Sequence, residues 1–181
     1  LDRAQTDARV KGIAAKMKEG GFSLAQIEEL RRAIKRFRAT GKFAHIYAES
    51  WGPETGGMGA YYLATGFGEI WMQPVGNLYI PGIGIEAPYA RALLDRLGIA
   101  PQFFARKEYK NIFESFTATE MGEASREAAV SLVGDLAAHM LDDMASDRKL
   151  AKEELTAQID KGLLTDDEAL AAKLIDRLDY A

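Results

Sequence analysis

The sequence predicts an α/β domain built on a mainly parallel sheet. Short apolar runs of strand length alternate with longer segments in which apolar residues recur at helical spacing. This alternation is typical of parallel strands joined by right-handed helical crossovers. The composition agrees, because 48% of the residues are hydrophobic and 28% are charged, as in ordinary globular proteins. A chain of 181 residues is long enough for one domain with a substantial core.

The first half of the chain contains a well-marked helix. Ser23 and Gln26 have the spacing of a capping box, which predicts a helix start. Apolar residues then recur at helical spacing as far as Phe37, and Gly41 is a typical stop. The Arg and Lys residues of this segment are expected on the opposite face, in contact with solvent.

Shorter elements follow in a region rich in turns. The segment 51–84 contains more than half of the chain's 17 glycines, and such loops often form sites. In and beside this segment we expect, in chain order, a buried strand, a short helix and a second strand: 43–48, 61–64 and 69–72.

Later elements continue the alternation and then change to helices alone. We expect a helix, a short strand and a helical stripe at 87–97, 102–106 and 109–116. From about Gly122 only helices are predicted. The first has an apolar face from Ala129 to Met144, the second ends before Gly162, and the last starts at Thr165 with Glu168 completing a capping box. The expected division is a core at 1–121 and a helical extension at 122–181, which packs on the core or on a neighbouring subunit.

Composition excludes several classes of function. The net charge is only −4 and basic residues alternate with acidic ones, so we expect no nucleic-acid partner. The absence of cysteine excludes disulfides, thiolate metal sites and a cysteine nucleophile. No run reaches the roughly 18 apolar residues needed to cross a bilayer. The first residue, Leu1, is not Met, from which we expect a fragment or a processed product.

A glycine motif at 82–87 matches the dinucleotide-binding pattern G-x-G-x-x-A. Two prolines, Pro81 and Pro88, bracket it, and the basic pair Arg106-Lys107 stands about where an acidic ribose ligand is expected. We therefore interpret the motif as a glycine turn before a helix and expect no cofactor.

The two histidines lack the spacing of a catalytic or metal site. His45 lies within the predicted strand 43–48, and His139 follows two alanines on an amphipathic helix. An isolated histidine without a paired ligand or nucleophile carries little functional signal. We interpret both as structural and expect no metal.

Lys110 is an ordinary surface lysine by its sequence context alone. A lysine acts as a general base when desolvation or a nearby cation favours the neutral amine, which then accepts a proton from a serine hydroxyl. Such chemistry requires a serine partner.

The chain resembles the signal peptide peptidase A, or protease IV, family of bacterial serine peptidases along nearly its whole length. The residues that carry the resemblance fall in several segments: Arg9 to Ile13, Gly41 to Ala48, Tyr61 to Ala64, Phe104 to Lys110, Ser125 to Ala128, Glu168 to Leu170 and Leu174 to Asp176. The resemblance implies a ClpP/crotonase-like spiral of strand-strand-helix turns, here with the C-terminal helical extension.

The resemblance also implies a Ser/Lys catalytic dyad divided between two related domains in the family's long form. Tyr109-Lys110 matches the lysine motif, although Glu108 and Asn111 stand where the family has Gly and Ser. At the position of the nucleophilic serine this chain has Met58. The chain is therefore similar to the N-terminal half of the long form, with Lys110 as the catalytic residue and the serine on an absent C-terminal domain.

Further expectations follow from the same resemblance. Gly20-Gly21 stands where an active domain places oxyanion donors, and without a local serine we interpret it as structural. The expected partners are the serine-bearing domain, peptide substrates such as cleaved signal peptides, and further copies in a homo-oligomer, with a tetramer as one option. The expected location is the bacterial inner membrane facing the periplasm, with any anchor outside this chain.

Two alternatives remain open at this point. One is a catalytically inactive scaffold domain of the same fold, in which Lys110 is merely solvated. The other is a crotonase-like acyl-CoA enzyme, in which backbone amides hold a thioester oxyanion. The Tyr109-Lys110 motif argues against the second alternative.

Overall fold

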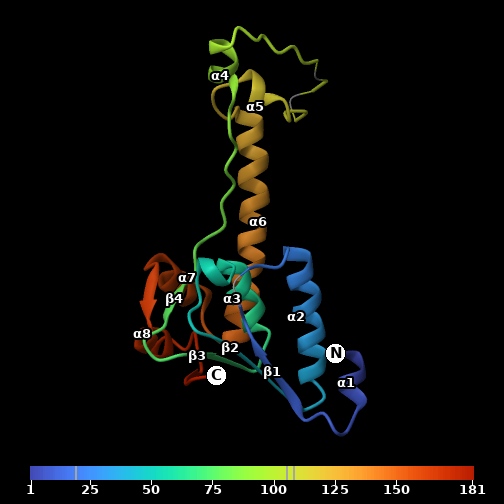
Figure 1. Cartoon of the computed structure of the whole chain (residues 1–181), viewed down its shortest axis with the longest axis vertical. Helices are drawn as coiled ribbons and strands as arrows, with labels where there is room; N and C mark the ends of the chain where they lie inside the picture. The colour runs from blue at the N-terminus through green and yellow to red at the C-terminus, as the bar shows by residue number, and fades with distance from the viewer. Residues whose placement is uncertain (19, 105, 108) are drawn as a thin grey trace. The chain divides into compact units, whose positions relative to one another are not determined.

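The computed structural model describes residues 1–18, 20–104, 106–107 and 109–181 (Figure 1). It contains two compact units: Leu1–Gly82 together with Met140–Ala181, which we call the sheet unit, and Ile83–His139, which we call the middle unit. This division differs from the expected boundary between residues 121 and 122, because the chain after 139 contributes strands and helices to the sheet unit. The division into a 1–121 core and a 122–181 extension stays a prediction about domains.

The sheet unit is built on a four-stranded parallel sheet. Its strands lie in the order β1-β2-β3-β6, with bounds Gly12–Lys16, Phe43–Ala48, Glu69–Met72 and Arg177–Leu178. Every pair is parallel, with His45 opposite Glu69 and Trp71 opposite Arg177. A smaller antiparallel pair joins β4 (Asn77–Tyr79) to β5 (Leu163–Thr165). The prediction of an α/β fold with a mainly parallel sheet is confirmed, as are the strands at 43–48 and 69–72.

Two helices bury the apolar side of this sheet. Alternate residues of the central strands are almost fully buried: Ala44, Ile46 and Ala48 on β2, and Ile70 and Met72 on β3. Helix α2 (Leu24–Arg38) contacts β2, α3 (Gly57–Thr65) contacts β3, and the two helices contact each other. The capping box at the start of α2 forms as predicted, because the Ser23 hydroxyl accepts from the Gln26 N–H and the Gln26 side chain accepts from the Ser23 N–H.

The remaining elements of the sheet unit are short. They are α1 (Asp2–Thr6), the 3-10 turn η1 (Pro53–Thr55), α7 (Lys152–Asp160) and α8 (Asp166–Ala171). The second predicted capping box also forms, between Thr165 and Glu168 at the start of α8. Both boxes were predictable because they depend only on residues three positions apart.

The middle unit is mostly irregular chain between short helices. It contains α4 (Arg91–Arg96), α5 (Glu114–Thr117) and the first turns of α6 (Glu123–Arg148), whose last turns belong to the sheet unit. The ring of Phe103 stacks on Phe113 and Phe116, with centroid distances of 5.6 and 6.1 Å.

Several expectations for this unit were wrong. The described residues 102–104 and 106 form no strand, because strand structure needs a ladder partner and the described part of this unit provides none. The helix expected at 87–97 is limited to α4, and the stripe at 109–116 is helical only from Glu114 onward. On α6, burial is restricted to Met140, Met144 and Ala145, whereas Leu132 is 54% exposed.

Within the described ranges, no helix has the length and apolar character that a membrane crossing requires.

Candidate active site

Lys110 lies in the middle unit, in irregular chain just before α5. Its side chain is exposed, and its N–H donates to the Lys107 carbonyl at 3.3 Å. Lys107 has a left-handed backbone, with φ of 77°, so the chain turns sharply immediately before Lys110. Position 108, where the sequence departs from the family's glycine, lies outside the described residues.

The two neighbours of Lys110 are each bound to the start of α6. The Tyr109 hydroxyl donates to Glu127 Oε2 at 2.8 Å, and the Asn111 amide donates from Nδ2 to Ser125 Oγ at 2.6 Å. Both acceptors lie within the first two turns of the helix. The loop that carries Lys110 is therefore hydrogen-bonded to α6 by the residue before the lysine and by the residue after it.

Glu114, the first residue of α5, fastens the same end of α6. Its carboxylate accepts from the Ser125 hydroxyl and, at 3.4 Å, from the Gly122 N–H. A carboxylate in this place satisfies donors near the helix start and interacts favourably with the positive end of the helix dipole. Because Ser125 receives Asn111 and donates to Glu114, these contacts form one connected network.

Met58, at the position of the expected nucleophile, lies in the sheet unit on the first turn of α3 and is only 6% exposed. Gly56 and Gly57 lead into this turn with φ of 103° and 59°, conformations that side chains rarely adopt. A Cβ at Gly56 would approach the Gly20 carbonyl oxygen to 3.1 Å. This sharp turn thus presents a buried thioether, which cannot attack a carbonyl as an alkoxide does.

Gly20 does not offer an unpaired oxyanion donor. Its N–H donates to the Glu54 carbonyl at 3.1 Å, and its φ of 106° requires glycine. An amide already bound to a backbone carbonyl stabilises the loop and has no hydrogen to give to an intermediate. The structural interpretation of Gly20 agrees with this geometry.

His45 packs against side chains of the neighbouring strand. His45 Nε2 is 3.5 Å from Glu69 Oε2, the same oxygen that accepts from the Trp71 ring N–H at 2.8 Å. The His45 ring also stacks on Trp71, with centroids 5.5 Å apart, and His139 is exposed on α6. In the part of the chain that the structure describes, no three potential ligands gather to hold a metal ion.

The glycine motif at 82–87 does not form a helix-start anion site. The described residues 82–90 contain no helix, and α4 begins only at Arg91. A dinucleotide-binding turn requires a helix N-terminus immediately after its glycines to receive the pyrophosphate. The motif therefore has no support as a cofactor site.

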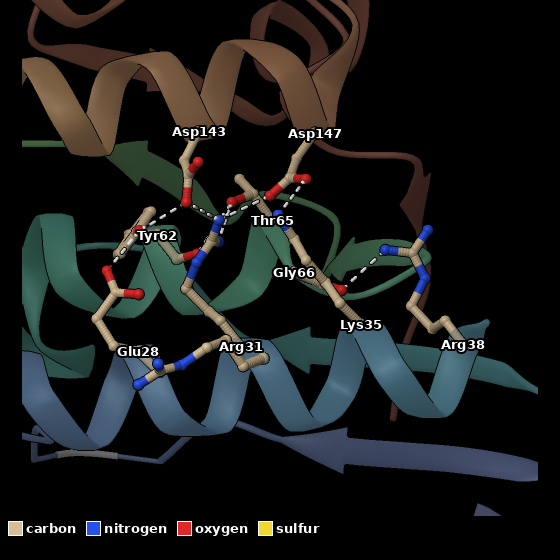
Figure 2. Close-up of polar contacts among 10 residues, drawn as sticks. Glu28, Arg31, Lys35, Arg38, Tyr62, Thr65, Gly66, Asp143 and Asp147 are labelled. Atoms are coloured by element: carbon tan, nitrogen blue, oxygen red, sulfur yellow. Dashed lines mark hydrogen bonds and ion pairs between the residues drawn. The ribbon is translucent and has the colours of Figure 1, made fainter.

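A buried polar cluster in the sheet unit was missed from the sequence (Figure 2). Arg31 of α2 was expected in solvent with the other basic residues, but it is only 2% exposed. Its guanidinium lies 3.7 Å from the centre of the Tyr62 ring and donates to Thr65 Oγ1 at 2.7 Å, both on α3. It also donates to Asp143 at 3.1 Å and Asp147 at 2.8 Å, both on α6.

The cluster holds three helices together. Lys35 adds an ion pair of 2.8 Å to Asp147, and the Tyr62 hydroxyl is hydrogen-bonded to Glu28 and Asp143 at 2.6 and 2.8 Å. Burial raises the pKa of Asp143, but hydrogen bonds from Tyr62 and Arg31 outweigh it and leave that pKa below its ordinary value. Burial and the bonds to both carboxylates raise the pKa of Tyr62 far above the ordinary range. A signal was present in the sequence, because Arg31 stands between Ile27 and Ile34 on the buried face of α2.

Most of the chain matches one known family of peptidases. The sequence pattern described as Peptidase family S49 matches residues 47–181, which include both the Met58 turn and Lys110. The chain belongs to peptidase family S49. The resemblance to the signal peptide peptidase A family is thereby confirmed.

Curated relatives of this S49 chain are themselves named as proteases. "Protease 4" of Salmonella typhi is 28% identical over 156 residues, which cover 86% of this chain and 24% of the relative. "Serine protease SPPA, chloroplastic" of Arabidopsis thaliana is 22% identical over 178 residues, covering 98% of this chain and 26% of the relative. The chain spans about a quarter of the length of these relatives.

The fold of the S49 chain also matches a solved peptidase. A crystal structure of a peptidase from Plasmodium falciparum has a TM-score of 0.50 and 9% identity, covering 94% of this chain and 80% of that one. The likeness supports the α/β spiral predicted from the resemblance. Within this S49 chain, Lys110 belongs to the middle unit and Met58 to the sheet unit.

Proposed function

We propose that this S49 chain supplies the general base, Lys110, to a serine endopeptidase whose nucleophile is carried by a further domain of the same protein. The observation that carries the proposal is the pairing of a Tyr109-Lys110 motif with Met58 at the position of the serine. Burial of Met58 and the occupied N–H of Gly20 support it, because both make a complete local site unfavourable.

The chemistry assigned to Lys110 is a proton transfer. As a neutral amine, the lysine accepts the proton of the serine hydroxyl while the serine oxygen attacks the carbonyl carbon of the scissile peptide. The ammonium then returns a proton to the leaving amine, and water hydrolyses the resulting acyl-enzyme. The exposed position of Lys110 in this chain supports the view that a partner domain must cover it to favour the neutral form.

The proposal extends to substrate, assembly and location. Peptides such as cleaved signal peptides are the proposed substrates, the assembly is a homo-oligomer, and the location is the periplasmic side of the bacterial inner membrane. These assignments rest on the family resemblance rather than on contacts in the chain.

Substitution of the lysine in the full-length protein tests the proposal. Lys110→Ala removes the base, and Lys110→Arg retains the charge but cannot release its proton at working pH, so both should abolish peptide cleavage. Lys107→Arg is the matched control, since it makes the same change three positions away and should retain activity. Cleavage by either Lys110 variant at the wild-type rate would end the proposal, because this domain would then be a catalytically inactive scaffold beside an active site located elsewhere in the protein.

A further inference from the structure

The residues on either side of Lys110 share one anchor. Tyr109 is bound to Glu127 at 2.8 Å and Asn111 to Ser125 at 2.6 Å, and both acceptors belong to the start of α6. These two contacts join side chains 18 and 14 residues apart in the sequence. They are therefore tertiary contacts rather than local turn contacts.

The anchor is itself held in place. The Ser125 hydroxyl, which accepts from Asn111, donates to the Glu114 carboxylate, and the same carboxylate accepts from the Gly122 N–H. A hydroxyl that both accepts and donates has a fixed orientation, so its oxygen is directed toward Asn111. The hydrogen bond from Asn111 thus ends on a hydroxyl whose orientation is held by Glu114.

A lysine in such a loop needs this support to act as a base. Its amine is carried on a flexible four-carbon stem, and Lys110 itself lies outside helix and strand. The amine can be placed reproducibly only when the backbone at its own Cα is held. A displacement of about 1 Å at a reacting group can lower a rate about a hundredfold.

We propose that Tyr109 and Asn111 are positioning residues for Lys110, acting through Glu127 and Ser125. The inference rests on the proposed function, because it matters for catalysis only if Lys110 is the base. Neither residue touches the reacting atoms in this scheme. Their loss should reduce turnover and leave the affinity for the substrate unchanged.

Conservative substitutions in the full-length protein test the Tyr109 side. Tyr109→Phe removes only the hydroxyl and Glu127→Ala removes its acceptor, whereas Glu127→Gln keeps a side-chain oxygen that can accept the same bond. We expect the first two to lower kcat between tenfold and a hundredfold, to about the same extent, with KM unchanged. Glu127→Gln should retain a kcat within about threefold of the wild-type value. The double variant Tyr109→Phe/Glu127→Ala should be no slower than either single variant.

The Asn111 side is tested in the same assay. Ser125→Ala removes the acceptor of Asn111, whereas Ser125→Thr keeps a hydroxyl, so only the alanine variant should lower kcat. Glu123→Ala is the matched control for Glu127→Ala, because it removes another carboxylate near the start of α6 and should leave kcat unchanged. Melting temperatures measured for all variants separate positioning from loss of structure.

The outcomes distinguish this inference from the proposed function. If Lys110→Ala is inactive but Tyr109→Phe, Glu127→Ala and Ser125→Ala all turn over at the wild-type rate, the positioning role is refuted and the base remains. The positioning role is also refuted if KM rises, or if thermal stability falls together with kcat. It is refuted as well if Glu127→Gln does not retain kcat. If Lys110→Ala is active, the proposed function fails and the positioning role fails with it.

Discussion

Replacing Arg31 by methionine should destabilise the sheet unit strongly, because it removes a buried cation to which two carboxylates of α6 are bound. Asp147, with a side chain only 12% exposed, loses a 2.8 Å bond and keeps its ion pair with Lys35. Removing one partner of a buried ion pair typically costs about 3–5 kcal/mol. The surviving Lys35 pair and the 37% exposure of the Asp143 side chain place our expectation at about 3 kcal/mol.

Chemical unfolding measures this loss directly. Urea titration of the 181-residue chain, followed by circular dichroism, should show a lower midpoint with an unchanged slope. For a chain of this size, about 3 kcal/mol corresponds to a fall in melting temperature of roughly 6–12 °C. Arg32→Met is the matched control, because it makes the same substitution at the next, exposed position of α2 and should change stability by less than about 0.5 kcal/mol.

The pH dependence of the Arg31 variant gives a second check. The pKa of folded Asp143 is lowered, so its contribution to stability is present above the ordinary value of 3.8 and is lost as pH falls through the folded value. The difference between wild type and Arg31→Met should therefore be largest near neutral pH and shrink below about pH 4. A difference under about 1 kcal/mol at neutral pH, or one that grows in acid, would refute the argument.

Three further predictions concern other parts of the chain. The isolated chain should cleave no peptide and should not be labelled at any serine by a fluorophosphonate, as judged by mass spectrometry; a single stoichiometric label would contradict the divided site. Met58→Ser should create no measurable turnover of a fluorogenic peptide, because the nearby Gly20 N–H already donates to Glu54, and turnover above background would show a better-formed local site than we describe. Ser23→Ala should cost about 1 kcal/mol in urea unfolding through loss of the capping box, and no change would mean that the box adds nothing to α2.

The elements predicted correctly from sequence are those that depend on neighbouring residues. The capping boxes at Ser23 and Thr165 involve residues three positions apart, and strand β2 follows from a compact run of apolar and aromatic residues. Each signal is contained in a short window, so no knowledge of the tertiary structure was needed.

The errors involve residues whose state depends on distant partners. The strand expected at 102–106 failed because an apolar run becomes a strand only beside another one, and the sequence does not say whether a partner is near. Arg31 was assigned to solvent because its carboxylate partners belong to a segment that the helical pattern of α2 cannot reveal.

The surroundings of the candidate site also depend on residues distant in the sequence. The sequence predicts Lys110 as a site residue only through family resemblance, because its own context is that of an ordinary surface lysine. The hydrogen bonds of Tyr109 and Asn111 to α6 could not be predicted, because nothing in their local sequence identifies Glu127 and Ser125 as acceptors.

The buried polar cluster has a consequence for how the chain is made. Arg31 binds carboxylates 112 and 116 residues further along, so α2 and α3 leave the ribosome well before the groups that neutralise it exist. At synthesis rates of about 5–20 residues per second, this delay is roughly 6–23 seconds. Because burying an unpaired charge is costly, we expect Arg31 to stay hydrated during that interval. Closure of α2 and α3 over it is then expected to follow the synthesis of Asp143 and Asp147.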